Sequence, residues 1–214
     1  PLGIAALEDK IVQQAVVTVL TEIYEEDFLG FSYGFRPGRG QHDALDAVWI
    51  GLGKKRVNWV LDADISSFFD TIDHDWMMRF LAHRIADRRI LRLVRKWLTA
   101  GVIEHGTKTT SKAGCPQGAV ISPLLANIYL HYVLDLWEHA KGDVIVVRYA
   151  DDSVVGFEDA GDARLFLDAL RTRLALFGLA LNDAKTRVVE FGRFALDRRA
   201  RRGQGRPETF DFLG

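Results

Sequence analysis

Residues 144–157 read Val144-Ile145-Val146-Val147-Arg148-Tyr149-Ala150-Asp151-Asp152-Ser153-Val154-Val155-Gly156-Phe157. Two apolar runs flank a short acidic segment, a pattern that predicts a strand, a two-residue acidic turn and a second strand. Adjacent carboxylates repel each other, which raises a pKa unless a cation neutralises the charge. Mg²⁺ is usually held by one or two carboxylates together with substrate phosphates. The acidic pair is therefore a candidate for half of a metal site for phosphoryl transfer. The alternative is a polar hairpin turn, because Asp is common in turns.

A two-metal site needs a further carboxylate from elsewhere in the chain, and residues 59–70 contain the best candidates. An apolar run there turns acidic at Asp62 and Asp64, which lie two residues apart and so share one face of a strand. Asp73 and Asp75 follow closely, but they precede a helical pattern. Asp73 is expected to be the N-cap of that helix, and Asp75 to lie in its first turn, where the helix dipole favours an acid.

The spacing of apolar residues predicts an α+β fold. Helices are expected over residues 7–20, 43–52, 73–85, 88–99, 122–140 and 162–177, strands over 57–65, 144–147, 154–157 and 187–191, a hairpin over 102–112, a loop over 30–40 and a mobile Arg-rich loop over 193–208. This order predicts a split βαβ antiparallel sheet with helices on one face. It places the end of the strand 57–65 beside the acidic turn, so Asp64 and Asp151 are expected to converge.

The composition limits the protein class. The chain has 214 residues, of which 48% are hydrophobic, enough for one large domain. No run approaches the roughly 20 apolar residues of a membrane span, so no membrane partner is expected. The single Cys115 excludes an internal disulfide and fits a reducing, cytoplasmic compartment. The net charge of −1 conceals basic runs over 84–112 and 193–206. These runs suit a phosphate-binding face, or are solvated helix faces.

Six blocks of the chain, in the same order, resemble those of the reverse transcriptases of bacterial group II introns. They are residues 31–39, 64–74, 116–130, 148–152, 181–186 and 210–214. The resemblance implies a polymerase palm with an antiparallel, ferredoxin-like sheet packed on helices, plus partial helical fingers. It implies partial fingers over 1–56 and a palm over 57–214, interrupted by helices and a hairpin at 73–115. The thumb and maturase regions are expected to lie outside this sequence, which is expected to be an excised domain.

The resemblance implies an RNA-directed DNA polymerase, in which a primer 3′-hydroxyl attacks the α-phosphate of a deoxynucleoside triphosphate. The implied cofactor is two Mg²⁺ ions, with Mn²⁺ as the alternative. The implied catalytic and metal residues are Asp64, Asp151 and Asp152, with the Ile65 carbonyl as a further ligand. Asp152 contributes to ion binding or tunes it, and Asp62 has a secondary role. The implied partners are an RNA template, a DNA primer, deoxynucleoside triphosphates and intron RNA.

Three further residues match nucleotide-binding positions of that family. Phe69 falls where a ring would clash with a ribose 2′-hydroxyl, and its alternative is core packing. Gln117 lies in a Pro-Gln-Gly turn, where its amide can address the sugar 3′-hydroxyl, and its alternative is a turn residue. Lys185 matches a residue that neutralises or protonates the leaving pyrophosphate, and its alternative is a surface lysine.

Nucleic-acid contacts are expected at two places. Arg36 and Arg39 lie in a Gly-rich loop suited to a template phosphate, although Arg36 could instead form a structural ion pair. Residues 210–214 resemble the strand that grips the primer end, which implicates Phe212, Leu213 and Gly214.

Other functions fit parts of the same pattern. An RNA-templated RNA polymerase or a nucleotide cyclase would use a similar sheet, but Phe69 argues against ribonucleotides. An RNA-binding maturase module that assists splicing would use the basic runs and leave the acids vestigial. A defence-type reverse transcriptase would keep the chemistry without an intron.

Overall fold

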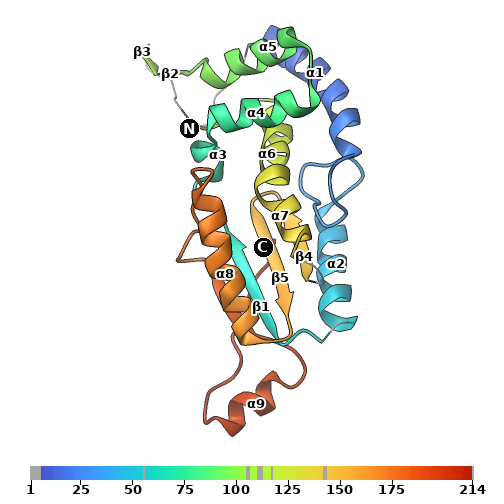
Figure 1. Ribbon diagram of the computed structural model, residues 1–214, viewed down its shortest axis with the longest axis vertical. Helices are drawn as coiled ribbons and strands as arrows, with labels where there is room; N and C mark the ends of the chain where they lie inside the picture. Colours follow the sequence, from blue (N-terminus) through green and yellow to red (C-terminus); the bar gives the residue numbers. More distant parts are fainter. Residues whose placement is uncertain are drawn as a thin grey trace.

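The computed structural model describes residues 6–54, 56–104, 107–109, 113–116, 118–141 and 144–213, whose arrangement is shown in Figure 1. Its helices and strands are α1 Leu7–Glu25, α2 Gln41–Lys54, β1 Trp59–Asp64, α3 Phe68–Thr71, α4 His74–Arg84, α5 Arg88–Thr99, β2 Val102–Glu104, β3 Thr107–Thr109, α6 Ser122–Leu130, the π-helix η1 His131–Asp135, α7 Leu136–His139, β4 Ile145–Tyr149, β5 Asp152–Phe157, α8 Ala160–Ala175, β6 Arg187–Glu190 and α9 Ala195–Arg201. Within these ranges, no helix combines the length and apolar character that a membrane span requires.

Four strands form one antiparallel sheet in the order β4-β5-β1-β6. β1 is central and pairs with β5 on one side and β6 on the other, while β4 pairs with β5 as a hairpin. Helices connect β1 to β4, and α8 connects β5 to β6, so the chain follows a βαββαβ path. The expected α+β class and split βαβ sheet are confirmed.

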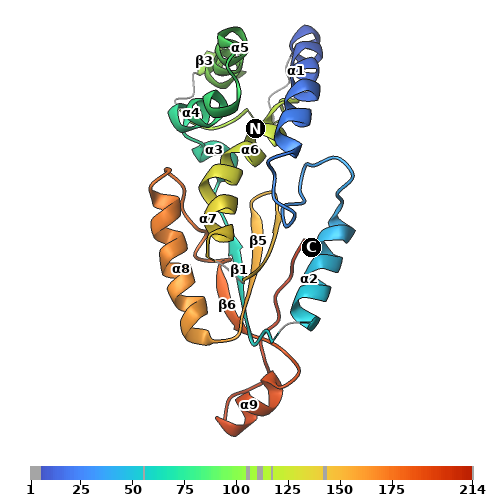
Figure 2. The same cartoon turned by 45° about the vertical axis from the view of Figure 1, so that its right-hand side comes forward.

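The two faces of the sheet have different neighbours, because side chains alternate along each strand. Leu61 of β1 belongs to a large core shared with α4, α6 and α8. Val60 faces the other way and packs in a smaller cluster with Ala44 of α2. Figure 2 shows α8 and α2 on opposite sides of the sheet, so helices cover parts of both faces rather than one. By alternation, Asp62 and Asp64 lie on the face that α2 covers.

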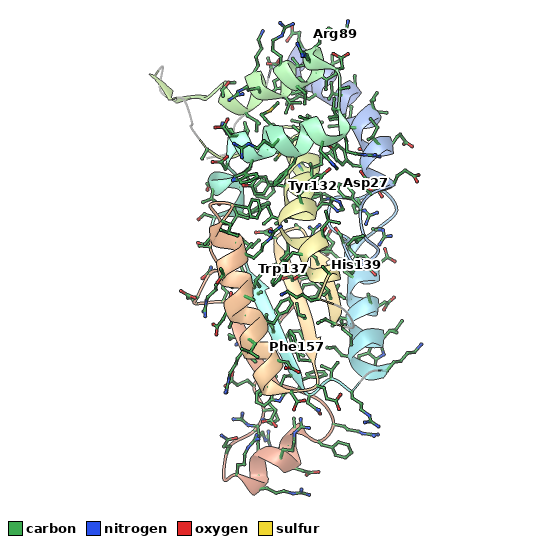
Figure 3. All side chains as sticks on the ribbon, viewed as in Figure 1. Asp27, Arg89, Tyr132, Trp137, His139 and Phe157 are labelled. Atoms are coloured by element: carbon green, nitrogen blue, oxygen red, sulfur yellow. The ribbon has the colours of Figure 1, made fainter. Side chains whose placement is uncertain are left out.

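Aromatic rings hold α8 against the sheet. The ring of Phe166 in α8 lies 5.1 Å from that of Trp137 in α7 and 5.2 Å from that of Phe157 in β5. Trp137 and Phe157 are labelled in Figure 3, beside α8. Buried aromatic pairs of this kind contribute about 0.5–1.5 kcal/mol beyond the area that they bury. The helical layer behind the acidic hairpin is therefore firmly fixed.

The long helix expected over 122–140 is continuous but not uniform. It begins as α-helix with Pro123 in its first turn, as expected, and changes to π-helical hydrogen bonding over His131–Asp135. It then returns to α-helix for one turn, Leu136–His139. A π-type turn takes in one residue more than an α-turn and is frequent at functional sites. Apolar spacing predicted the helix but could not reveal this change.

The prediction of a mobile loop over 193–208 is wrong, because this segment contains α9. Arg198 donates to Glu190 (2.9 Å) and to Asn58 Oδ1 (2.6 Å), both at the end of the sheet. Arg202 also pairs with Glu190, whose side chain is only 1% exposed. A buried carboxylate requires such partners, so the basic run anchors the segment to the sheet.

Candidate active site

Three carboxylates meet where β1 ends and β5 begins. Asp64 is the last residue of β1, and its cross-strand partner is Asp152, the first residue of β5. Asp151 precedes it in the turn. Tyr149 pairs with Asp152, so the two-residue turn is Ala150-Asp151 rather than the acidic pair itself. The structure therefore brings the three predicted acids together, with Asp152 directly opposite Asp64.

Burial and nearby negative charge raise the pKa values of Asp151 and Asp152. Burial raises the pKa of Asp152 to about 6, helped by the charges of Asp151 and Asp64 and by a hydrogen bond to the Asp64 carboxyl. Burial also raises the pKa of Asp151, and the charge of Asp64 adds to this effect, whereas Lys185 opposes it. Perturbed carboxylates that share a site are typical of centres where a cation or proton must balance charge.

The donor set fits a divalent cation that is shared with a substrate. Within the residues that the structure describes, no group of three or more His, Cys, Asp or Glu side chains is arranged to hold a metal ion by itself. The charges of Asp64 and Asp151 instead raise the pKa of Asp152, so a cation bound there would relieve their repulsion. Because Mg²⁺ usually completes its coordination with substrate phosphates, two or three carboxylates are sufficient on the protein side.

The turn that carries Asp151 has a constrained backbone. Ala150 has a φ of 55°, in the left-handed region that residues with a Cβ rarely adopt. Gly34 packs directly against it: a Cβ at position 34 would lie 2.4 Å from the Ala150 nitrogen. In addition, Tyr33 N donates to the carbonyl of Arg148, at 2.9 Å. The glycine-rich loop therefore supports the acidic turn.

Arg148 holds the same turn from inside. Its side chain is fully buried and pairs with the equally buried Asp135 of η1, at 2.6 Å. Further donors reach the Ala150 carbonyl (2.8 Å), Ser32 Oγ (2.7 Å) and Asn127 Oδ1 (3.2 Å). Sequence patterns did not indicate a role for Arg148. The available signal was an arginine within an apolar strand, since arginine is almost never fully buried unless it is paired.

Two cations face the acids from the β6 side. Lys185 Nζ lies 3.5 Å from Asp64 Oδ1, and Arg187, the cross-strand partner of Asp62, lies 3.7 Å from its carboxylate. Burial raises the pKa of Asp62, while Arg187 opposes the effect. All four side chains line one cavity of about 640 Å³. The residues around this cavity are Gln41, Asp62, Asp64, Tyr149, Ala150, Asp152, Ala184, Lys185, Arg187, Asp211, Phe212 and Leu213.

The predicted primer-grip segment forms one wall of this cavity through Phe212 and Leu213. Both side chains also pack on the smaller hydrophobic cluster behind it. Gly214 and Gln117, which were predicted to bind primer and nucleotide, lie outside the described residues.

Ile65 follows Asp64 directly and Phe69 lies four residues further along the chain; neither belongs to the described cavity lining. Ile65 is buried and bridges to Leu181. Phe69 is half-buried; its ring lies 5.4 Å from that of Phe68 and 6.4 Å from that of Phe35, which is 48% exposed. Phe69 thus packs against the main core, as its alternative expects, and keeps part of its surface exposed.

Arg36 forms a structural ion pair, which was the alternative to template binding. Its guanidinium pairs with Glu25 at 2.7 Å and donates to the carbonyls of Leu29 and Ser32, both at 2.8 Å. The residue is only 7% exposed, so its donors serve the loop rather than a template phosphate. Arg39 is more accessible and lies over the ring of Tyr33 while it donates to a loop carbonyl.

Three other candidates have structural roles. Asp73 accepts a hydrogen bond from Trp76 N at 2.8 Å, which confirms the predicted N-cap. Asp75 pairs on the surface with Arg95. Cys115 is buried and donates to Ser122 Oγ, and burial raises the pKa of its thiol to about 11. Such a thiol is a poor nucleophile at neutral pH.

Residues 1–214 match the family model described as "Reverse transcriptase (RNA-dependent DNA polymerase)". The chain belongs to this family. The group II intron-encoded protein LtrA of Lactococcus lactis subsp. cremoris is 42% identical over 213 residues, which cover 92% of this chain and 35% of LtrA. Protein YkfC of Escherichia coli K12 is 46% identical over 134 residues, which cover 61% of this chain and 35% of YkfC. The chain thus spans about a third of these two relatives, and the resemblance inferred from six sequence blocks is confirmed.

Solved telomerase structures share the fold. Apo telomerase from Candida tropicalis, truncated from its C-terminal domain, superposes with a TM-score of 0.63 at 14% identity, over 86% of this chain and 41% of that one. Telomerase from Candida albicans gives a TM-score of 0.61 at 16% identity, over 85% of this chain and 35% of that one. At such low identity, these likenesses establish the shared fold alone.

Proposed function

We propose that this chain carries the nucleotidyl-transfer centre of a group II intron-type RNA-directed DNA polymerase. The observation that carries the proposal is the meeting of Asp64 and Asp152 in cross-strand register, with Asp151 in the adjoining turn, beside a cavity that also contains Lys185. Membership of the reverse transcriptase family over the whole chain supports the same reaction. In the proposed domain division, residues 1–56 are partial fingers and 57–214 are palm.

A divalent cation is the cofactor class of this family. We propose two Mg²⁺ ions, held by Asp64, Asp151 and the Ile65 carbonyl, with Asp152 contributing to ion binding or tuning it. When bound, such ions stabilise the charge that develops on the attacking and leaving oxygens. The chain's own groups set the geometry: Gly34 and Arg148 hold the turn that carries Asp151, next to Asp152, the cross-strand partner of Asp64.

The proposed substrates are an RNA template, a DNA primer and deoxynucleoside triphosphates, with intron RNA as a further partner. Lys185, 67% exposed at its side chain and near Asp64, can donate to a leaving pyrophosphate. Phe69 would exclude a ribose 2′-hydroxyl, and Gln117 would address the 3′-hydroxyl. The primer end would lie along Phe212, Leu213 and Gly214.

Template contact is proposed for Arg39 rather than Arg36. Arg39 retains partial exposure, whereas Arg36 is buried with its donors engaged. Arg36 would have to give up its contacts with Glu25 and the loop carbonyls in order to bind a phosphate.

Primer extension on an RNA template, with and without Mg²⁺, tests the proposal in the protein that carries this chain. Asp151→Asn and Asp64→Asn are expected to lower the rate at least about 100-fold, because each removes a cation ligand. Asp75→Asn is the matched control, since Asp75 is exposed and pairs only with the surface residue Arg95 among the contacts of the described chain. Extension that survives in both active-site variants would defeat the proposal. Intron splicing that persists without extension would identify a separate maturase role.

A further inference from the structure

We infer that Arg187 binds a backbone phosphate of the nucleic-acid strand in the active-site cavity, with Asp62 as its resting partner. This inference rests on the proposed function and assigns a role to two residues that the proposed chemistry leaves unused. Arg187 is the first residue of β6 and pairs in register with Asp62 of β1. Both side chains line the same cavity as Asp64 and Lys185.

The ion pair leaves Arg187 available. Its side chain is 44% exposed, whereas that of Asp62 is 17% exposed, and the closest nitrogen and oxygen are 3.7 Å apart. A guanidinium has five N–H donors, and one loose carboxylate contact does not engage them all. At 3.7 Å the closest nitrogen and oxygen are too far apart for a strong hydrogen bond, so little is lost when Arg187 exchanges this contact for a phosphate.

The charges around the cavity show why such a residue is needed. The described lining contains four carboxylates, Asp62, Asp64, Asp152 and Asp211, against two cations, Lys185 and Arg187. Lys185 lies next to Asp64, at the end where chemistry is proposed. At the other end, the charge of Asp211 adds to that of Asp62. A polyanion would be repelled there unless Arg187 offsets the acids.

The position favours a strand backbone over the triphosphate of an incoming nucleotide. Asp62 lies two residues before Asp64 on β1, a step of about 7 Å along a strand, on the side away from the acidic turn. A phosphate held there belongs to a position further along the strand than the reacting one. Phe212 and Leu213, where the primer end is proposed to lie, line the same cavity.

Equilibrium binding of a labelled primer–template duplex, measured without nucleotide over a range of KCl concentrations, tests the inference. Arg187→Gln is expected to weaken binding about 5- to 10-fold and to reduce the salt slope by about one charge, and Arg187→Lys should restore most of the loss. Arg171→Gln is the matched control: this arginine is 47% exposed and pairs with Asp183 outside the cavity lining. The control should leave both quantities unchanged.

Asp62→Asn is expected to change duplex affinity in the opposite direction. It removes a repelling charge and releases the guanidinium, so duplex binding should tighten, an effect that damage to the fold would not produce. Unchanged duplex affinity in both Arg187→Gln and Asp62→Asn would overturn the inference. So would a raised nucleotide KM with unaltered duplex affinity, because it would assign the phosphate to the triphosphate. Primer extension by the unmodified protein separates the two proposals. If duplex binding depends on Arg187 but no extension occurs, the proposed reaction is wrong and the phosphate contact of Arg187 is still supported.

Discussion

Arg148 and Asp135 form an ion pair in which both side chains are completely buried, with 2.6 Å between Nε and Oδ1. The pair joins β4 to the π-helical segment, and the same guanidinium donates to the Ala150 carbonyl in the acidic turn. The geometry of the candidate active site therefore depends on a charge pair buried behind it.

Asp135→Asn should destabilise the protein by about 3–5 kcal/mol, because it leaves the Arg148 charge buried without its counterion. Chemical denaturation monitored by circular dichroism measures the free energy of unfolding. The control is Asp168→Asn, which removes an exposed partner of Arg171 and should cost less than about 0.5 kcal/mol. A loss below about 1 kcal/mol in Asp135→Asn would show that the pair is not essential to the fold.

Gly34→Ala should impair catalysis more than folding. The added Cβ would lie 2.4 Å from the Ala150 nitrogen, so the acidic turn must move. Misplacement of a catalytic group by about 1 Å can cost about 100-fold in rate, and single-turnover primer extension measures the effect. Gly30→Ala is the control, since nothing lies within 4 Å of its added Cβ. Equal rates in the two variants would contradict the proposed support of the turn.

Asp152→Asn should change how stability depends on pH. The folded protein raises the pKa of Asp152 from 3.8 to about 6, so the folded state binds this proton more tightly than the unfolded state does. The contribution to stability is complete below pH 3.8 and is lost as the pH rises through about 6. Above that pH, without divalent ions, the variant should be more stable than the unmodified protein by about 1 kcal/mol, allowing for the screening of a half-exposed group. Thermal unfolding between pH 4 and pH 8 in EDTA measures this difference, and parallel curves for the two proteins would contradict it.

Phe69→Ala should relax the choice of sugar. The proposed ring clash with a 2′-hydroxyl disappears, so incorporation of ribonucleotides relative to deoxyribonucleotides should rise about 10-fold or more, the value of a lost clash of about 1.4 kcal/mol. Primer extension with dNTPs or NTPs on the same template gives the ratio. Phe194→Ala, at a 54% exposed ring near α9, is the control for loss of an aromatic side chain. An unchanged ratio of ribonucleotide to deoxyribonucleotide incorporation would show that Phe69 only packs against its neighbours.

The features that could be predicted from the sequence are those determined by a few neighbouring residues or by the order of strands and helices along the chain. The N-cap at Asp73 is encoded within four consecutive residues, Asp73–Trp76. The approach of Asp64 to the acidic hairpin followed from the order of strands and helices, because a βαββαβ path places the first strand beside the third. Alternation along β1 also placed Asp62 and Asp64 on one face.

The features that escaped prediction depend on partners remote in sequence. Helix α9 is held by Arg198 bonded to Asn58, 140 positions earlier, so its Arg-rich composition resembled a loop. Arg148 finds Asp135 only because the helix before β4 changes its hydrogen bonding. Apolar periodicity contains no information about such a change, nor about the displacement of the two-residue turn to Ala150-Asp151.

The π-helical turn also decides which face of its helix carries Asp135. In an α-helix, residues seven apart lie within about 20° of one face, and a π-type turn adds one residue to that repeat. Asn127 and Asp135 are eight apart and both reach Arg148. If these eight residues formed a regular α-helix, Asp135 would lie about 80° around the axis from Asn127 and would turn away from Arg148. The extra residue taken in by the π-type turn is therefore what lets a single guanidinium be bound from two levels of the same helix.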